Sequence, residues 1–289
     1  METWVKTYGM RHRNNTLNDI VLPGTINSSQ YEIIDSKIDI KKHCFVDCIN
    51  KNWILHQKYN IYTQLVKGVR FLNINIHYEK NEFYVGENFC YCKLDSILQD
   101  ISKFNKDYGD IFILNIVHDN SINSIIKEDL CNILIDLYNK HIIYTKNYIR
   151  PLNTRIYEFI EKKVNMIIYM KGTDHIFYSI NNYSYNNYNY NYSIDEYVCN
   201  FQRKLDKLSV TNNKDLLINF NWNRNFSCIN MFIGLVWFCG YRNLKQYSNN
   251  LNIKLNKFIC KNKRNIKNIN VISVNYINDN IIGNIIDIN

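Results

Sequence analysis

The sequence predicts a single α/β domain spanning residues 1–289, a distorted barrel of parallel β-strands alternating with α-helices. The length of 289 residues suits one barrel, a fold that commonly takes about 250 residues. Short runs with strand character alternate with longer runs of helical spacing along the chain. A hydrophobic fraction of 46%, with 23 tyrosines and 14 phenylalanines, is sufficient for a large core, so disorder throughout is not expected.

The first half of the chain predicts alternating strands and helices. VRFLNINI at 69–76 alternates apolar and polar residues like a strand with one buried face, and IFILNIV at 111–117 is almost wholly apolar, as in a strand covered on both faces. Between them, apolar residues from 94 to 104 recur at helical spacing. The other elements expected here are a strand at 17–22 leading into a Pro-Gly turn, a helix at 59–67 stopped by Gly68, and a short strand at 83–85.

The second half repeats the alternation. We expect helices at 124–138, 155–162 and 194–208, and strands at 164–170, 216–220 and 270–277, followed by a short closing element. The tract NNYSYNNYNYNYS at 181–193 has no buried-face period and predicts a low-complexity Asn/Tyr surface loop inserted into the barrel. The most apolar stretch, 226–240, is shorter than the roughly 20 residues that cross a bilayer, so we interpret it as a buried element.

Composition restricts partners and location. The net charge of +9 permits attraction to an anionic surface, and its main concentration is the run from Lys254 to Lys267, interpreted first as a solvated helix face and second as a contact for an anionic membrane. No nucleic-acid-binding motif accompanies this run, so no nucleic-acid partner is expected. Nine cysteines without zinc-site spacing, and a start without an apolar leader, favour a cytoplasmic protein with reduced thiols, peripheral at membranes if it meets them. The absence of alanine and the excess of Asn, Ile, Lys and Tyr indicate an A/T-rich coding bias.

Two motifs carry a family resemblance. LPGTINS at 22–28 is similar to the Pro-Gly-Thr-His-Asp-Ser motif that opens the X domain of phosphatidylinositol-specific phospholipases C, and IYTQLVKGVRFLNIN at 61–75 is similar to that family's Gln-Leu-x-x-Gly-x-Arg signature. The run VISVNYI at 271–277 resembles the family's last strand. The resemblance covers about residues 17–119 and the tail, and implies a TIM-type barrel whose functional groups lie at the carboxyl ends of the strands.

The resemblance also implies a chemistry that this chain has lost. In the family, one histidine takes a proton from an inositol hydroxyl, a second protonates the glycerol leaving group, and an arginine or calcium ion stabilises the phosphate charge. Ile26 stands at the first histidine and Val85, or a one-residue deletion, at the second. Neutral residues stand at the positions of charged or metal-binding groups: Asn27, Asn73, Asn75, Asn275 and a position near Val117. We therefore expect a degenerate site with no intact catalytic set, no bound metal or other cofactor, and in particular no calcium.

Other residues could take over part of this chemistry. His77 and His118 follow strand residues near the expected barrel mouth, although structural roles are the simpler interpretation of both. Lys171 and Arg224 are candidates for contacting a phosphate or headgroup, with ordinary surface charge as the alternative.

Three hypotheses for the function follow. The leading one is a catalytically impaired, phospholipase-C-like barrel that binds a phosphoinositide headgroup or a protein partner. The second is an active phosphodiesterase, cleaving a phosphoinositide or related phosphodiester, in which His77 or His118 replaces the lost groups. The third is a structural or assembly subunit. Turnover of lipid or inositol phosphate separates the first two, and a copurifying partner would favour the third.

Overall fold

The computed structural model describes residues 1–32, 55–86, 92–118, 122–138, 141–143, 150–173, 177–178, 194–210, 217–222 and 244–289. The expected loop at 181–193 and the apolar stretch 226–240 therefore lie outside the described residues. The helices are α1 (Trp4–Arg11), α2 (Ile61–Val66), α3 (Leu94–Asp107), α4 (Ser124–Tyr138), α5 (Ile156–Glu161), α6 (Ile194–Val210), α8 (Leu244–Ile266) and α9 (Asp279–Ile286), with 3₁₀ turns η1 (Leu17–Asp19) and η5 (Pro151–Asn153). The strands are β1 (Leu22–Thr25), β2 (Phe71–Glu79), β3 (Glu82–Val85), β4 (Cys92–Lys93), β5 (Phe112–His118), β6 (Ile142–Ile143), β7 (Met166–Met170), β8 (Asn219–Trp222) and β9 (Val271–Val274).

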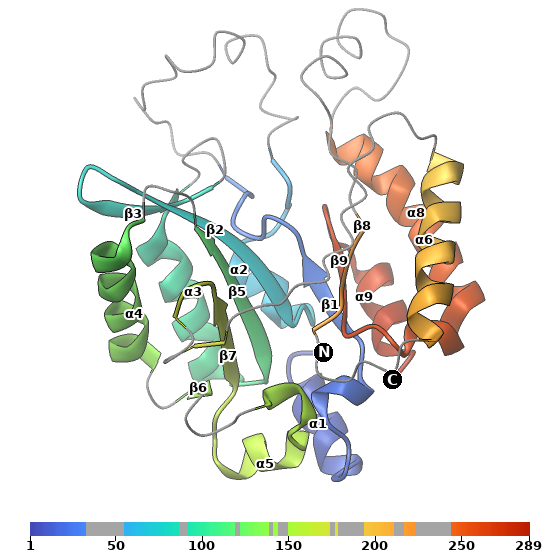
Figure 1. Ribbon diagram of the computed structural model, residues 1–289, viewed down its shortest axis with the longest axis horizontal. Coiled ribbons are helices and arrows are strands. Elements are labelled where there is room, and N and C mark those ends of the chain that lie inside the picture. The colour runs from blue at the N-terminus through green and yellow to red at the C-terminus, as the bar shows by residue number, and fades with distance from the viewer. Residues whose placement is uncertain are drawn as a thin grey trace, which may run out of the picture.

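Seven parallel strands form the curved sheet of a distorted TIM-type barrel, in the order β6-β7-β5-β2-β1-β9-β8. The first and last parts of the chain meet as neighbouring strands of this sheet, where Leu22 of β1 pairs with Val271 of β9. Strands β3 and β4 add an antiparallel extension to β2. Helices α3 and α4 lie beside the part of the sheet that contains β5, and α6 and α8 beside the part that contains β8 (Figure 1). The predicted fold class is confirmed.

Most expected elements are present, but the segment 17–22 is not a strand. Thr16 and Asp19 form a capping box that starts the 3₁₀ turn η1 at Leu17, and the strand begins only at Leu22. Pro23 and Gly24, expected in a turn, lie inside β1. The ladder between β1 and β2 begins at Gly24, so the missing N–H of Pro23 removes no hydrogen bond on that side.

The strands carry two different faces because side chains alternate along them. Alternate residues such as Leu72, Ile74 and Leu114 pack in one large core with residues of α3, α4, α8 and α9. The intervening residues face the barrel interior, where Phe71, Ile113 and other strand side chains form a second core with α1, η1 and α5. These last elements lie at the amino-terminal ends of the strands (Figure 1). The amino-terminal end of the barrel, which is its lower end in Figure 1, is therefore closed by apolar packing.

Gly24 is required by this crowded interior. A Cβ atom at position 24 would lie 2.6 Å from Ser273 Oγ and 2.8 Å from a methyl carbon of Val271. Both neighbours belong to β9, which is paired with β1 and cannot withdraw. The glycine of the first motif therefore serves the close approach of two strands, independently of any catalysis.

A buried ion pair connects the sheet to the amino-terminal helix. Arg70 and Asp110 are fully buried, with Arg70 Nε 2.8 Å from Asp110 Oδ2. The remaining guanidinium N–H groups donate to carbonyl oxygens of Leu65, Val69, Met1 and Glu2. Asp110 in turn accepts hydrogen bonds from the backbone N–H groups of the first turn of α1, at Val5 and Lys6. All five guanidinium donors are thus satisfied, which is what makes a buried charge tolerable.

Removing one partner of this pair should be severely destabilising. We expect Arg70→Met to lower the free energy of unfolding by about 3–5 kcal/mol, because it leaves the Asp110 carboxylate buried without its cation. Urea denaturation followed by circular dichroism measures the change. The matched control is Lys67→Met, which breaks the exposed pair with Asp279 and should cost at most about 1 kcal/mol. A loss below 1 kcal/mol for Arg70→Met would contradict this role of the pair.

Candidate functional site

The two sequence motifs contact each other through buried polar side chains. Gln64 accepts a hydrogen bond from Thr25 Oγ1 at 2.9 Å and donates to the carbonyl oxygen of Ser28 at 2.8 Å. Ser28 Oγ accepts from the backbone N–H of Asn73 at 2.8 Å. All three side chains lie in the loop and helix that join β1 to β2 or on those strands. The residues that the chain shares with the family motifs therefore hold the barrel mouth together.

Neutral amides line the barrel interior above its apolar floor. Asn73 and Asn75 of β2 share the interior face with Phe71, and Asn115 of β5 pairs with Asn73. Asn115 Nδ2 donates to Asn73 Oδ1 at 2.7 Å, and Asn75 Nδ2 donates to Asn27 Oδ1 at 3.0 Å. Asn27 follows β1 in a left-handed conformation (φ 48°), which asparagine tolerates better than most residues. The predicted positions Asn27, Asn73 and Asn75 thus form one cluster, and they carry no charge.

His56 completes this cluster, and sequence reasoning missed it. Its Nδ1 lies 3.2 Å from Asn275 Oδ1 and 3.4 Å from Asn27 Nδ2. The preceding stretch has no secondary-structure period, and the family motifs assign no role to this position, so the only signal was an isolated histidine shortly before a helix. Asn275 is one of the neutral residues that stand at the family's charged positions, and the structure places an imidazole against it.

The backbone fixes His56 from two sides. Its N–H donates to the carbonyl oxygen of Gln30, and its carbonyl oxygen accepts from the N–H of Tyr276 at 2.8 Å. The neighbouring buried Gln57 donates through Nε2 to the carbonyl oxygens of Ile26 and Val274. Segment 55–57 is thereby held across the carboxyl ends of β1 and β9, and its histidine reaches the amide cluster.

Burial lowers the pKa of His56 to about 4, and the hydrogen bond with Asn275 opposes this shift only in part. Desolvation has this effect because it disfavours the imidazolium ion, and no carboxylate of the described residues is hydrogen-bonded to the ring to compensate. The imidazole is therefore neutral near pH 7 and can accept a proton.

The two positions aligned with the family's histidines have different surroundings. Ile26 is 8% exposed, its N–H donates to Val274, and parallel register places it beside Asn275. Val85 is fully buried in the outer core, paired with Ile76 of β2, and so lies on the face away from Asn75. A histidine at position 85 would enter the apolar core, whereas position 26 lies at the mouth.

The substitute histidines do not join the amide cluster. His77 stacks on Tyr84 of the β2–β3 hairpin, with ring centroids 5.8 Å apart. His118 lies at the end of β5, on the face opposite Asn115 and Val117, and its Nε2 is 3.2 Å from the carbonyl oxygen of Lys171. Lys171 is exposed after β7, and Arg224 lies outside the described residues. Of the histidines predicted as substitutes, neither hydrogen-bonds to any of the clustered asparagines.

Among the residues that the structure describes, metal-binding side chains do not gather at the mouth. Within the described part of the chain, no group of three or more His, Cys, Asp or Glu residues is placed to hold a metal ion. Val117, aligned near a calcium carboxylate of the family, is 44% exposed and has no ligand atom in its side chain. The expectation that calcium does not bind remains a prediction.

The basic run forms the outer face of α8. Lys254, Lys257, Lys261, Lys263 and Arg264 are exposed, as the interpretation of a solvated helix face predicts. Because α8 leads into the start of β9, its basic last turns lie at the amino-terminal end of the barrel, away from the mouth. None of the helices that the structure describes combines the length and hydropathy needed to cross a bilayer.

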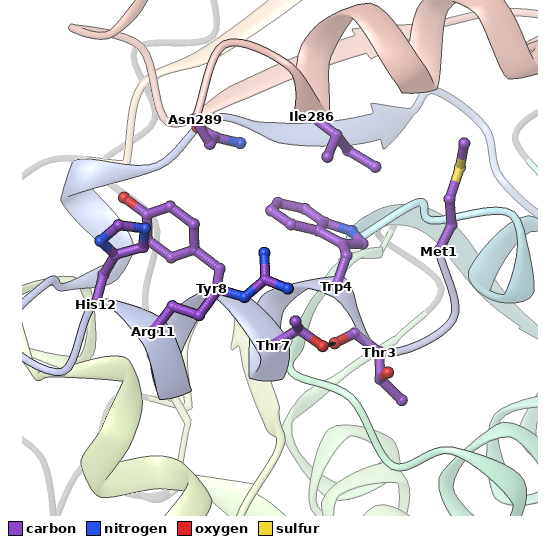
Figure 2. Close-up of a pocket in the computed structure, with 9 residues that line it drawn as sticks. All are labelled: Met1, Thr3, Trp4, Thr7, Tyr8, Arg11, His12, Ile286 and Asn289. Carbon is purple, nitrogen blue, oxygen red and sulfur yellow. Dashed lines mark hydrogen bonds between the residues drawn. The ribbon is translucent and has the colours of Figure 1, made fainter.

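A pocket of about 430 Å³ also lies at this lower end, between α1 and the carboxyl terminus (Figure 2). Trp4 and Tyr8 form its walls, Arg11 and His12 lie at its edge, and Ile286 faces them from α9. Trp4 Nε1 donates to the carbonyl oxygen of Gly68, so the indole also belongs to the packing below the sheet. The pocket is separate from the amide cluster and shares no residue with it.

A parallel barrel whose first two strands are joined by these motifs is a phospholipase-C-like barrel, and comparison with known proteins supports this class. The structure matches the phosphatidylinositol-specific phospholipase C of Listeria monocytogenes with a TM-score of 0.72 and 16% sequence identity, over 100% of this chain and 98% of that one. It matches the corresponding Staphylococcus aureus protein, in a structure concerned with membrane binding, with a TM-score of 0.67 and 18% identity, over 100% and 97%.

Sequence comparison gives the same family at low identity. A PI-PLC X-box domain-containing protein of Dictyostelium discoideum is 23% identical over 119 residues, which are 40% of this chain and 16% of that protein. No family model matches the chain. The resemblance to phosphatidylinositol-specific phospholipase C inferred from the motifs is confirmed, and the chain has a PI-PLC-like fold.

The buried imidazole should make stability depend on pH. The unfolded chain binds a proton at His56 near pH 6.5 and the folded chain only near pH 4, so the free energy of unfolding falls as the pH drops through this window. We expect a contribution of about 1–2 kcal/mol, below that of complete desolvation because the residue is half-buried. Urea denaturation from pH 7 to pH 4 measures it.

The comparison with two variants isolates this contribution. His56→Gln should flatten the decline, whereas His12→Gln, at an exposed position near the lower pocket, should keep it. Equal slopes for wild type and His56→Gln would show that His56 does not titrate differently on folding.

Proposed function

We propose that this chain is a PI-PLC-like barrel that binds the inositol phosphate headgroup of a phosphoinositide in its mouth, and that it is impaired in cleaving the natural lipid. The observation that carries the proposal is the cluster of Asn27, Asn73, Asn75, Asn115 and His56 at the carboxyl ends of the strands. Ligand sites of such barrels lie at this end.

The chemistry of the cluster suits a polyol better than an isolated anion. Each amide offers both donors and acceptors, and each inositol hydroxyl does the same, so the two sets can exchange hydrogen bonds in both directions. No lysine, arginine or carboxylate takes part in the described hydrogen bonds of the cluster. A phosphate would therefore be bound through N–H donors, without the cation that stabilises charge during cleavage.

The proposed impairment follows from the catalytic groups that the described cluster lacks. Each missing proton-transfer group costs about 10²–10⁴ in rate, and a missing source of positive charge about 10²–10³. The described cluster contains one imidazole and no cation. The similarity to a bacterial phospholipase C structure concerned with membrane binding supports a phosphoinositide surface as the partner.

Calorimetric titration with myo-inositol 1-phosphate tests the proposal. We expect saturable binding by the wild-type chain, weakened about tenfold by Asn75→Leu, since loss of one amide leaves its partners unpaired, a cost near 1–2 kcal/mol. Asn284→Leu, on α9, is the matched control because its amide contacts Asn256 at a distance from the mouth. Turnover of phosphatidylinositol vesicles at rates typical of active enzymes would contradict the impairment, and absence of binding would contradict the headgroup site.

Calcium provides an independent test. Ca²⁺ takes six to eight oxygen ligands, usually including several carboxylates, and the aligned positions Asn27, Asn73, Asn75 and Val117 provide none. We propose that no calcium binds in the mouth, so millimolar calcium should leave the Tm unchanged, because a ligand specific to the native state must raise it. A rise in Tm that disappears in Asn27→Ala would show that the site holds the ion.

A further inference from the structure

We propose that the pocket between α1 and α9 binds a small aromatic carboxylate, which stacks on Trp4 and Tyr8 and is held through its carboxylate by Arg11. The pocket lies at the amino-terminal end of the barrel and shares no residue with the amide cluster at the mouth. The inference goes beyond the proposed function, because it assigns a second ligand site and does not require an inositol phosphate in the mouth.

The aromatic wall of the pocket is held in place without a ligand. Trp4 is 9% exposed, and its Nε1 donates to the carbonyl oxygen of Gly68 at 3.0 Å. The hydroxyl oxygen of Tyr8 accepts from Asn15 Nδ2 at 2.6 Å, which fixes this ring as well. The imidazole of His12 extends the wall, with its ring centroid 4.5 Å from that of Tyr8. A ligand that stacks here therefore orders few side chains on binding.

The facing wall offers apolar contact. Ile286 of α9 lies across the pocket from the aromatic rings (Figure 2). The side chain of Asn289 accepts from the backbone N–H of Val21 at 2.8 Å and donates to the carbonyl oxygen of the same residue at 3.1 Å. Because the Asn289 amide is already paired in this way, a ligand meets mainly the Ile286 side chain on this side.

Arg11 supplies the pocket with a cation. Its side chain extends along α1 toward Trp4, and its guanidinium lies between the rings of Trp4 and Tyr8 in the view of Figure 2. Among the described residues, none forms an ion pair or a hydrogen bond with this guanidinium. The nine residues that line the pocket include no aspartate and no glutamate. A planar guanidinium matches a carboxylate through two parallel hydrogen bonds, so the pocket suits an anion.

The size of the pocket and its aromatic wall restrict the ligand further. A volume of about 430 Å³ lies in the range of about 300–1,000 Å³ that is typical of small-molecule sites. Aromatic rings stack on tryptophan and tyrosine, which adds to the gain from burying apolar surface. One guanidinium balances one carboxylate and leaves the further charges of a polyphosphate unpaired. These properties together define an aromatic monocarboxylate with one ring or two fused rings.

General attraction of anions is a separate effect that a test must exclude. The basic face of α8 lies at the same end of the barrel, and the chain carries a net charge of +9. Arg13 gives the matched control, because its guanidinium lies 4.6 Å from the ring centroid of Tyr157 and does not line the pocket. Arg13→Gln and Arg11→Gln remove the same charge from the same end of α1, but only the second changes the pocket.

Calorimetric titration with naphthalene-2-carboxylate tests the site. We expect saturable binding of one molecule per chain, weakened at least about tenfold by Arg11→Gln and less than about twofold by Arg13→Gln. The neutral analogue naphthalene-2-carboxamide, which has the same shape, should bind at least about tenfold more weakly than the carboxylate. Thr7→Trp, which adds a large ring at an exposed position of the pocket, should abolish binding. Circular dichroism verifies that each variant is folded.

A second titration distinguishes this pocket from the mouth. Saturating myo-inositol 1-phosphate should leave the affinity for naphthalene-2-carboxylate unchanged, and so should Asn75→Leu, because Asn75 belongs to the amide cluster and does not line the pocket. This expectation holds whether or not the mouth binds a headgroup.

Four results would overturn the proposal. Absence of binding at millimolar naphthalene-2-carboxylate would show that the pocket does not take such a ligand. Equal affinity for the carboxylate and the carboxamide would exclude the contact with Arg11, and equal losses in Arg11→Gln and Arg13→Gln would indicate general attraction by charge. Competition by myo-inositol 1-phosphate would place the aromatic acid in the mouth.

Discussion

The buried pair of Arg70 and Asp110 connects the amino-terminal helix α1 to the segments that precede β2 and β5. The guanidinium lies at the start of β2 and contacts the end of α2 and the first residues of the chain, while the carboxylate precedes β5 and caps the first turn of α1. A charge without solvent must have every donor and acceptor matched, so this position tolerates few alternatives. The floor of the barrel, where Trp4 and Val5 meet Phe71 and Ile113, is assembled around it.

Above that apolar floor, the direction of each side chain decides whether a residue of the family motifs is kept or replaced. Gln64, Thr25 and Ser28 are buried and hydrogen-bonded to one another, so a change in any of them leaves a buried partner unsatisfied. Asn73 and Asn75, on the interior face of β2, are only partly buried and carry less of this constraint. They can stand in place of charged residues because neutral amides satisfy each other there, as the pairs of Asn115 with Asn73 and of Asn75 with Asn27 do.

His56 shows how one chemical group can be supplied from a different part of the chain. The imidazole that faces Asn275 comes from the segment before α2, while Ile26, beside Asn275 in the register of β1 and β9, is buried and apolar. Gln57 binds the carbonyl oxygens at the ends of both strands, which brings the segment within reach. Among the described residues, the clustered amides of Asn27, Asn73 and Asn75 are neutral, and the His56 imidazole lies against Asn27 and Asn275.

The sequence by itself determined the fold class and most of its elements, because the period of apolar residues in runs such as 111–117 and 94–104 reflects which faces must be buried. It also identified Asn27, Asn73, Asn75 and Asn275, since the motifs fix their place at the strand ends. It misplaced the first strand, where the local capping of Thr16 and Asp19 forms a turn. Only the tertiary structure decided that Val85 faces the core, that His118 contacts the Lys171 backbone, and that His56 enters the mouth. Such placements depend on contacts between residues as far apart as His56 and Asn275, and local periodicity carries no information about which distant side chains meet.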